Sequence, residues 1–348
     1  MFTTFSGPHY LRTNTTEAAG KTPLLFVHGN TSTGAWWAPL MRCFDPQRYF
    51  CVAPDLNGFG QTKFRPIGAR TGVRDWARDL TDLLDRLGIA RAHVVASSLG
   101  GIVGWQLLAA HSARLLSVVQ IAPGSPYGFG GTQGAEGTPN FPDFAGSGAG
   151  MSNPALIARI RAGDRSKQPP VVTSPAWVLQ QYVLRNRMEL DEAHPLLDGM
   201  FSLRLEDGGF PGDVLPSPNW PGYAPGERGI VNSISPKQLR GLAEAVLQAR
   251  EPVPLLWLRG AEDAIVSDRS GSDPAVLGAL GLIPGFPGEA DLPPQPMLLQ
   301  TRALLDARAA NGTPYRESVL SGLGHCPYLE EPQRVHAEIS GWLADFRA

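Results

Sequence analysis

Two adjacent serines, Ser97 and Ser98, stand between a run of valines and a pair of glycines in the stretch VVASSLGG, residues 94–101. A parallel strand that turns abruptly into a helix presents the turn residue beyond the carboxyl edge of its sheet. Such a turn is strained and requires small residues two positions before and two after its apex. Around Ser98 these positions hold Ala96 and Gly100, whereas around Ser97 they hold a valine and a leucine. The spacing therefore predicts that Ser98 is the presented residue and that Ser97 is a supporting turn residue.

A serine hydroxyl is a weak nucleophile at neutral pH, so it needs a base that removes its proton and a carboxylate that orients the base. His325, in LSGLGHCPYLEEP, follows the last predicted strand, and Asp263, in LLWLRGAEDAIV, follows the strand before it. We therefore predict Ser98 as nucleophile, His325 as base and Asp263 as orienting acid. Glu262 and Asp268 remain alternatives for the acid, because both are close to Asp263 in the sequence.

The remaining histidines are predicted to have no catalytic role. His28 directly follows the first apolar run, and we expect it to hold the loop that begins there. The others are expected to be ordinary surface or helix residues: His9, His93, His111, His194 and His336.

Short apolar runs bounded by turn residues predict strands that are covered on both faces. They occupy residues 24–27, 49–53, 92–96 and 115–121, and two later strands are predicted at 253–258 and near 315–320. Helical patterns separate them, at residues 73–87, 99–110, 236–247, 297–309 and 335–346, the third opened by a capping box that starts at Ser235. This alternation predicts an α/β fold with a mostly parallel sheet and helices on both faces.

Residues 123–234 break this alternation, because they are rich in glycine and proline. Two short helices are predicted there, at Asn153-Pro154 and Ser174-Pro175, each an N-cap residue followed by proline. A structureless loop of this length is improbable in a compact domain. We therefore predict a core formed by residues 1–122 and 235–348 and a large inserted cap at 123–234, whose aromatic residues are Trp177, Tyr182, Phe201, Trp220 and Tyr223.

The chain resembles the α/β-hydrolase superfamily, and within it the capped esterases and lactonases that use a serine nucleophile. The resemblance rests on His28-Gly29, on Ala96-Ser97-Ser98-Leu99-Gly100, on Gly260-Ala261-Glu262-Asp263 and on Gly324-His325, and Asp55-Leu56-Asn57-Gly58-Phe59-Gly60 is similar to a further turn of that superfamily. It covers about residues 20–122 and 235–346. It implies the α/β-hydrolase fold and an oxyanion hole formed by the backbone N–H groups of Leu99 and Asn30.

These residues indicate a cofactor-independent serine hydrolase that cleaves a carboxylic ester or lactone through an acyl-enzyme on Ser98. The apolar cap indicates a medium-sized hydrophobic substrate. Serine at the apex argues against the related dehalogenases and epoxide hydrolases, which use a carboxylate nucleophile. Two alternatives stay open: a carbon-carbon bond hydrolase of a vinylogous diketone, suggested by the loop GNTSTGAWW, and a ligand receptor with the shape of a hydrolase.

The amino-acid composition limits the partners, cofactors and cellular location that we expect. The chain has 348 residues, of which 43% are apolar, and a formal net charge of −2, which gives no basic surface for nucleic acid. Its start lacks the pattern of a signal peptide, and no apolar run is long enough to span a membrane, so we expect a cytoplasmic monomer or homodimer. The spacing of the three cysteines, Cys43, Cys51 and Cys326, is not that of metal ligands, so we expect no metal or cofactor. We expect their thiols to be free, and a disulfide bridge between Cys43 and Cys51 remains an alternative.

Overall fold

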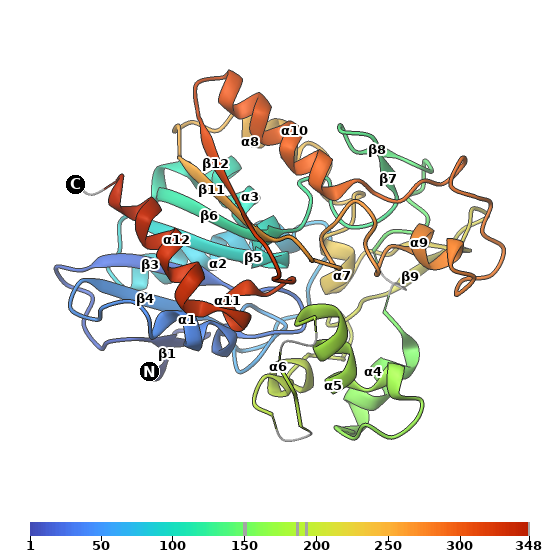
Figure 1. Cartoon of the computed structure of the whole chain (residues 1–348), viewed down its shortest axis with the longest axis horizontal. Helices are drawn as coiled ribbons and strands as arrows, with labels where there is room; N and C mark the ends of the chain where they lie inside the picture. Colours follow the sequence, from blue (N-terminus) through green and yellow to red (C-terminus); the bar gives the residue numbers. More distant parts are fainter. Residues whose placement is uncertain (149–151, 186–187, 192–193, 347–348) are drawn as a thin grey trace.

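An eight-stranded sheet forms the centre of the molecule in the computed structural model, which describes residues 1–148, 152–185, 188–191 and 194–346 (Figure 1). Its strand order is β1-β2-β4-β3-β5-β6-β11-β12. β2 runs antiparallel to β1 and β4, and all other neighbours are parallel. The bounds are β1 Phe2–Ser6, β2 His9–Thr13, β3 Thr22–Val27, β4 Tyr49–Pro54, β5 Ala92–Ser98, β6 Leu115–Pro123, β11 Leu255–Gly260 and β12 Tyr315–Leu320. The predicted mostly parallel α/β architecture is confirmed.

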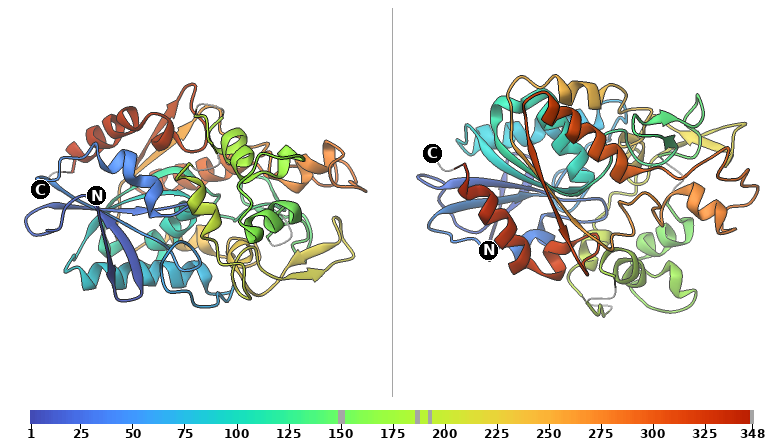
Figure 2. Two further views of the ribbon diagram at one scale, coloured as in Figure 1. Left: turned by 90° about the horizontal axis from the view of Figure 1, so that it is seen from below. Right: turned by 45° about the horizontal axis from the view of Figure 1, so that its top comes forward.

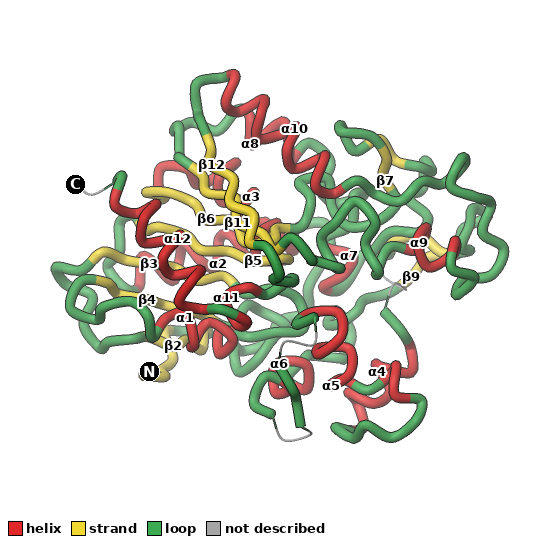
Figure 3. The backbone as a smooth tube through the Cα atoms, viewed as in Figure 1, coloured by secondary structure: helices red, strands yellow, loops and turns green. Residues whose placement is uncertain are grey.

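Helices cover both faces of this sheet (Figures 1 and 3). One group packs together around α3 and consists of α2 Gly72–Arg86, α3 Leu99–His111, α8 Leu242–Leu247 and, against α8, α10 Met297–Ala310. The other group consists of α1 Ala38–Met41, α11 Pro327–Glu330 and α12 Pro332–Ala344, with the 3₁₀ turn η1 Gly34–Trp37 beside them. α3 is apolar on nearly all sides because it lies between the sheet, α2 and α8.

Residues 123–234 form short elements beyond the carboxyl ends of the strands (Figures 1 and 2). They are β7 Thr132–Gln133, β8 Thr138–Pro139, α4 Pro154–Ala162, η3 Val171–Thr173, α5 Pro175–Val178, η4 Leu179–Val183, α6 Leu197–Phe201, β9 Val214–Pro216, β10 Tyr223–Pro225 and α7 Ile230–Ser233. α9 Pro274–Ala279, from the later glycine-rich stretch, lies on the same side of the molecule. The two stretches contact each other, since the indole N–H of Trp220 donates to the Pro284 carbonyl at 2.9 Å and its ring packs on Phe286.

Several local predictions need correction. The helix expected from Ser235 begins only at Leu242, because the Ser235 hydroxyl donates to the Asn232 carbonyl and Gly241 takes a positive φ of 78°. Asn153 caps α4 as predicted, but the Ser174 side chain makes no cap bond to α5. His9 and His93 are buried rather than on the surface, with 5% and 3% exposure.

The N-terminal hairpin of β1 and β2 was not predicted, because its residues form no continuous apolar run and β1 is largely exposed. The three cysteines are free, so the bridge between Cys43 and Cys51 is absent. In the described ranges, no helix is long and apolar enough to cross a membrane.

Candidate active site

Ser98 occupies a strained turn between β5 and α3, as the small flanking residues predict. Its φ of 57° and ψ of −120° are unusual for a residue with a side chain. A Cβ on Gly100 would collide with the carbonyl oxygens of Val27 and His28, and one on Gly29 would lie 2.9 Å from the Ser98 Cβ. The turn therefore fits only with glycine at both positions.

The two serines differ in accessibility. Ser97 is fully buried, whereas Ser98 is partly exposed at the carboxyl end of the central strand β5. The structure thus presents Ser98, and not Ser97, at the sheet edge.

His325 and Asp263 meet at the same edge, in the loops that follow β12 and β11. The Nδ1 of His325 lies 2.9 Å from the Asp263 Oδ2, and the two side chains are only 5% and 4% exposed. The other oxygen of Asp263 accepts from the backbone N–H groups of Ile265 and Val266, at 2.8 and 3.0 Å. The carboxylate is therefore fixed, and it selects the tautomer of His325 with the proton on Nδ1.

Neither alternative acid is placed to do this. Glu262 is exposed, and Asp268 accepts from the backbone N–H groups of Leu298 and Leu299 at the start of α10. The Glu262 backbone instead ties the two loops together, since its N–H donates to the Leu323 carbonyl at 2.9 Å.

Two groups that could act as an oxyanion hole lie next to Ser98. Leu99 is the first residue of α3, where a backbone N–H has no acceptor within the helix. Asn30 follows Gly29, which lies against Ser98. In the part of the chain that the structure describes, the Asn30 N–H has no hydrogen-bond acceptor. Neither N–H group has an acceptor among the described residues, and their role as an oxyanion hole stays a prediction.

His28 and Asp55 hold the loop that carries Asn30. His28 donates from Nδ1 to the Gly29 carbonyl at 2.8 Å, and its Nε2 accepts from the Leu56 N–H at 3.0 Å. Burial lowers the pKa of His28 to about 4, so the ring stays neutral and keeps both bonds. The fully buried Asp55 accepts from the Gly34 N–H at 2.9 Å and pairs with Arg12 at 2.8 Å.

Two supporting residues escaped prediction. Arg12 lies in β2, a strand with no apolar run to reveal it. Glu330 holds the loop of His325 by accepting from the Gly324 N–H at 3.0 Å, and a glutamate six residues along carries no recognisable pattern. Among the elements that support the site, the turn that contains Asp55 could be recognised in the sequence, because it is similar to a turn of the α/β-hydrolase superfamily.

The Ser98 hydroxyl and His325 make no hydrogen bond to each other in the described residues. Catalytic hydrogen bonds are often long or misaligned without substrate and tighten in the complex. The structure therefore shows an oriented imidazole and a presented hydroxyl at one sheet edge, without a hydrogen bond between them among the described residues.

Residues from 123–234 reach this site at two points. A Cβ on Gly199 in α6 would lie 2.8 Å from the Trp36 Nε1 and 3.2 Å from the Thr31 carbonyl oxygen. A Cβ on Gly324 would lie 2.6 Å from the Arg185 Cγ. Both loops that carry candidate catalytic groups are thus in contact with the insertion. No group of three or more His, Cys, Asp or Glu side chains suited to a metal ion occurs in the ranges described above.

Comparisons with known proteins agree with this architecture. Residues 22–146 match the alpha/beta hydrolase fold family. A Caulobacter vibrioides protein named as a carbamate hydrolase, RutD, is 35% identical over 118 residues, which cover 34% of this chain and 43% of the relative. The chain thus spans less than half the length of this relative.

Two solved structures match almost the whole chain. The serine hydrolase CCSP0084 of Cycloclasticus zankles has a TM-score of 0.54 at 18% identity, covering 99% of this chain and 97% of the other. The N-acyl homoserine lactonase AidH has a TM-score of 0.51 at 17% identity, covering 97% and 93%. With these matches and the sheet edge described above, the chain has the α/β-hydrolase fold, and its residues 22–146 carry the sequence pattern of the family of that name.

Proposed function

We propose that the protein is a serine hydrolase that cleaves a carboxylic ester or lactone of a medium-sized hydrophobic substrate. Ser98 attacks the acyl carbon, and Nε2 of His325 takes the hydroxyl proton and returns it to the leaving oxygen. Asp263 stabilises the imidazolium that forms, while the N–H groups of Leu99 and Asn30 hold the oxyanion. Water activated by His325 then releases the acid from Ser98.

The observation that carries the proposal is the 2.9 Å contact between His325 Nδ1 and Asp263 Oδ2 at the edge where Ser98 is presented. A histidine that is paired with an aspartate and buried in the loops at this edge supplies the base and the orienting carboxylate that a serine nucleophile requires. This arrangement favours an enzyme over the hydrolase-shaped receptor, because a receptor that only binds needs no activated hydroxyl.

We further propose that residues 123–234 act as a cap on a core of residues 1–122 and 235–348. The contacts of Gly199 and Arg185 with the site loops support this role. So do the low exposures of His325 and Asp263, because a covered site excludes water and strengthens electrostatic interactions inside it. Part of the aromatic content packs within the insertion, as Trp177 does on Tyr182 at 5.6 Å.

The bond type can be tested with four substrates presented to the purified protein. These are p-nitrophenyl hexanoate, N-hexanoyl homoserine lactone, a p-nitrophenyl carbamate and a vinylogous diketone whose cleavage is followed in the ultraviolet. We expect the ester and the lactone to be cleaved faster than the other two, with all cleavage lost in Ser98→Ala. Preference for the carbamate, in line with the name of the Caulobacter relative, or for the diketone would contradict the proposed bond type. Activity that survives in Ser98→Ala would contradict the site.

A further inference from the structure

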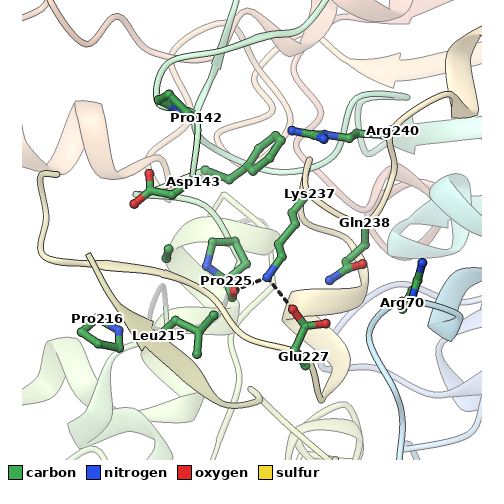
Figure 4. Close-up of a pocket in the computed structure, with 12 residues that line it drawn as sticks. Arg70, Pro142, Asp143, Leu215, Pro216, Pro225, Glu227, Lys237, Gln238 and Arg240 are labelled. Atoms are coloured by element: carbon green, nitrogen blue, oxygen red, sulfur yellow. Dashed lines mark hydrogen bonds and ion pairs between the residues drawn. The ribbon is translucent and has the colours of Figure 1, made fainter. Parts of the chain in front are cut away.

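Two adjoining hollows lie outside the candidate active site, with volumes of about 520 and 230 Å³. They share Arg70, Gln238 and Arg240 as lining residues, and we call them together the basic hollow. The larger one is within the usual size range of small-molecule sites. Figure 4 shows the residues that line the larger hollow, with Lys237 between Arg240 and the hairpin of β9 and β10.

The basic hollow has more positive than negative groups. Arg70, Arg74 and Arg240 line the smaller part, and none of its other described lining residues carries a carboxylate. Among the described residues, Arg70 and Arg74 have no ion pair, and Arg240 has only a ring contact, 4.6 Å from Phe144. Three guanidinium groups around one concave surface leave their donors to water or to a ligand.

The carboxylates of the larger part are already engaged. Glu227 pairs with Lys237 at 2.6 Å. Asp143 accepts from the Ser217 hydroxyl at 2.6 Å and from the Asn219 amide at 3.1 Å. These two groups therefore leave the three arginines unneutralised.

One residue that lines the basic hollow also has a buried hydrogen-bond donor without a partner among the described residues. The Nε2 of Gln238 is buried and has no hydrogen-bond partner in the described part of the chain. Figure 4 shows this amide between Arg70 and the pair formed by Lys237 and Glu227. Because this nitrogen is closed to solvent, a ligand in the hollow reaches it only after the amide turns toward the hollow, and the bond then recovers the free energy that an unpaired buried donor costs.

The larger part of the basic hollow is also lined by apolar side chains. Phe144, Leu215, Pro216 and Pro225 line the larger part, and Leu215 is exposed in the structure. A ligand that matches both halves carries an anionic head and a short apolar tail.

We propose that the basic hollow is a second ligand site, which binds a small amphipathic organic anion. The carboxylate or phosphate head accepts from Arg70, Arg240 and Gln238, and the apolar tail packs on Phe144, Leu215 and Pro225. Arginine suits this role because its planar fork matches the oxygens of carboxylate and phosphate. None of these residues belongs to the proposed catalytic machinery, so the inference does not depend on the proposed function.

Titration calorimetry on the full chain at low ionic strength tests the site, with hexanoate, hexyl phosphate and neutral 1-hexanol as probes. We expect one or both anions to bind and hexanol not to bind. The double variant R70Q/R240Q should weaken anion binding by at least about 10-fold, because two charge-assisted contacts are lost. The control R42Q/R161Q changes the net charge equally at exposed arginines outside the hollow and should bind as the parent does.

A second variant separates binding from folding. Gln238→Glu keeps the shape of the side chain but places a negative charge beside the head group, so it should abolish anion binding. The urea midpoint and the hydrolytic activity of both hollow variants should stay at parental values. Absence of anion binding, equal binding of hexanol, or equal weakening in R42Q/R161Q would overturn the proposal.

Discussion

The loops at the carboxyl edge of the sheet and the insertion at 123–234 meet at the candidate active site, but they are held in different ways. In the edge loops, buried side chains fix the backbone, as Asp263 and Asp55 each accept from backbone N–H groups. The insertion touches those loops through a few contacts, such as the bond from the Trp36 indole to the Leu196 carbonyl at 3.1 Å. In the function proposed above, the edge loops carry the chemistry and the insertion controls access to it. Four changes test this division, from the largest expected effect to the smallest.

Asp263→Asn should have the largest effect. An amide can accept from or donate to His325, but it cannot stabilise the imidazolium, so kcat should fall by about 10⁴-fold with little change in fold. Steady-state kinetics on p-nitrophenyl hexanoate measure it. Asp268→Asn is the matched control, because Asp268 only caps α10 and should keep kcat within a factor of two or so. Equal losses in the two variants would remove Asp263 from the mechanism.

Stability should fall on acidification, because the edge loops and the sheet each hold a neutral histidine. Burial lowers the pKa of both His28 and His93 to about 4. Below pH 6.5, the ordinary pKa of histidine, both residues become protonated in the unfolded chain but stay neutral in the folded chain. The free energy of unfolding therefore falls between pH 6.5 and pH 4. Each histidine accounts for a loss of up to about 3 kcal/mol.

Urea unfolding at pH 7 and pH 4.5 measures this loss. His93→Gln, in β5 and hydrogen-bonded to Ser117 at 2.8 Å, should remove about half of the loss that the two histidines cause. A free energy of unfolding that does not change between the two pH values would contradict the assignment of both rings as neutral.

Gly29→Ala should disturb the nucleophile itself. Its new methyl group would lie 2.9 Å from the Ser98 Cβ, so either Ser98 or the loop that carries Asn30 must move. We expect kcat/KM to fall by about 100-fold, because small displacements of reacting groups are costly. Gly341→Ala in α12 is the control, because apart from the adjoining backbone of its own helix no described atom lies within 4 Å of the added methyl. A parental rate in Gly29→Ala would mean that this loop does not position the site.

Trp36→Phe should have the smallest effect, because it loosens the insertion without altering a reacting group. Loss of the bond to the Leu196 carbonyl costs about 1 kcal/mol. We expect this loss to raise KM up to about fivefold while kcat stays unchanged. Trp342→Phe removes an indole N–H that has no partner among the described residues and serves as the control. A fall in kcat with unchanged KM in Trp36→Phe would contradict the proposal that the insertion controls access while the edge loops carry the chemistry.

The same division explains what the sequence could predict. Ser98, Asp263 and His325 could be predicted because each lies at or soon after the carboxyl end of a predicted strand, and parallel strands bring these ends to one edge. His93 was misjudged because its partner, Ser117, is 24 residues away on the neighbouring strand. The arrangement of 123–234 was not predictable, since it depends on pairs such as Asp143 with Ser217 and on glycines with positive φ, neither of which leaves a periodic pattern.

The central claim is that the hydroxyl of Ser98 is activated by His325, and covalent labelling with a fluorophosphonate tests it most directly. The folded protein is labelled, digested and mapped by mass spectrometry, beside Ser98→Ala and Asp263→Asn. The account predicts one adduct on the peptide that contains Ser98, none in Ser98→Ala and much slower labelling in Asp263→Asn. An adduct on another residue, or a folded protein that takes no label, would contradict it.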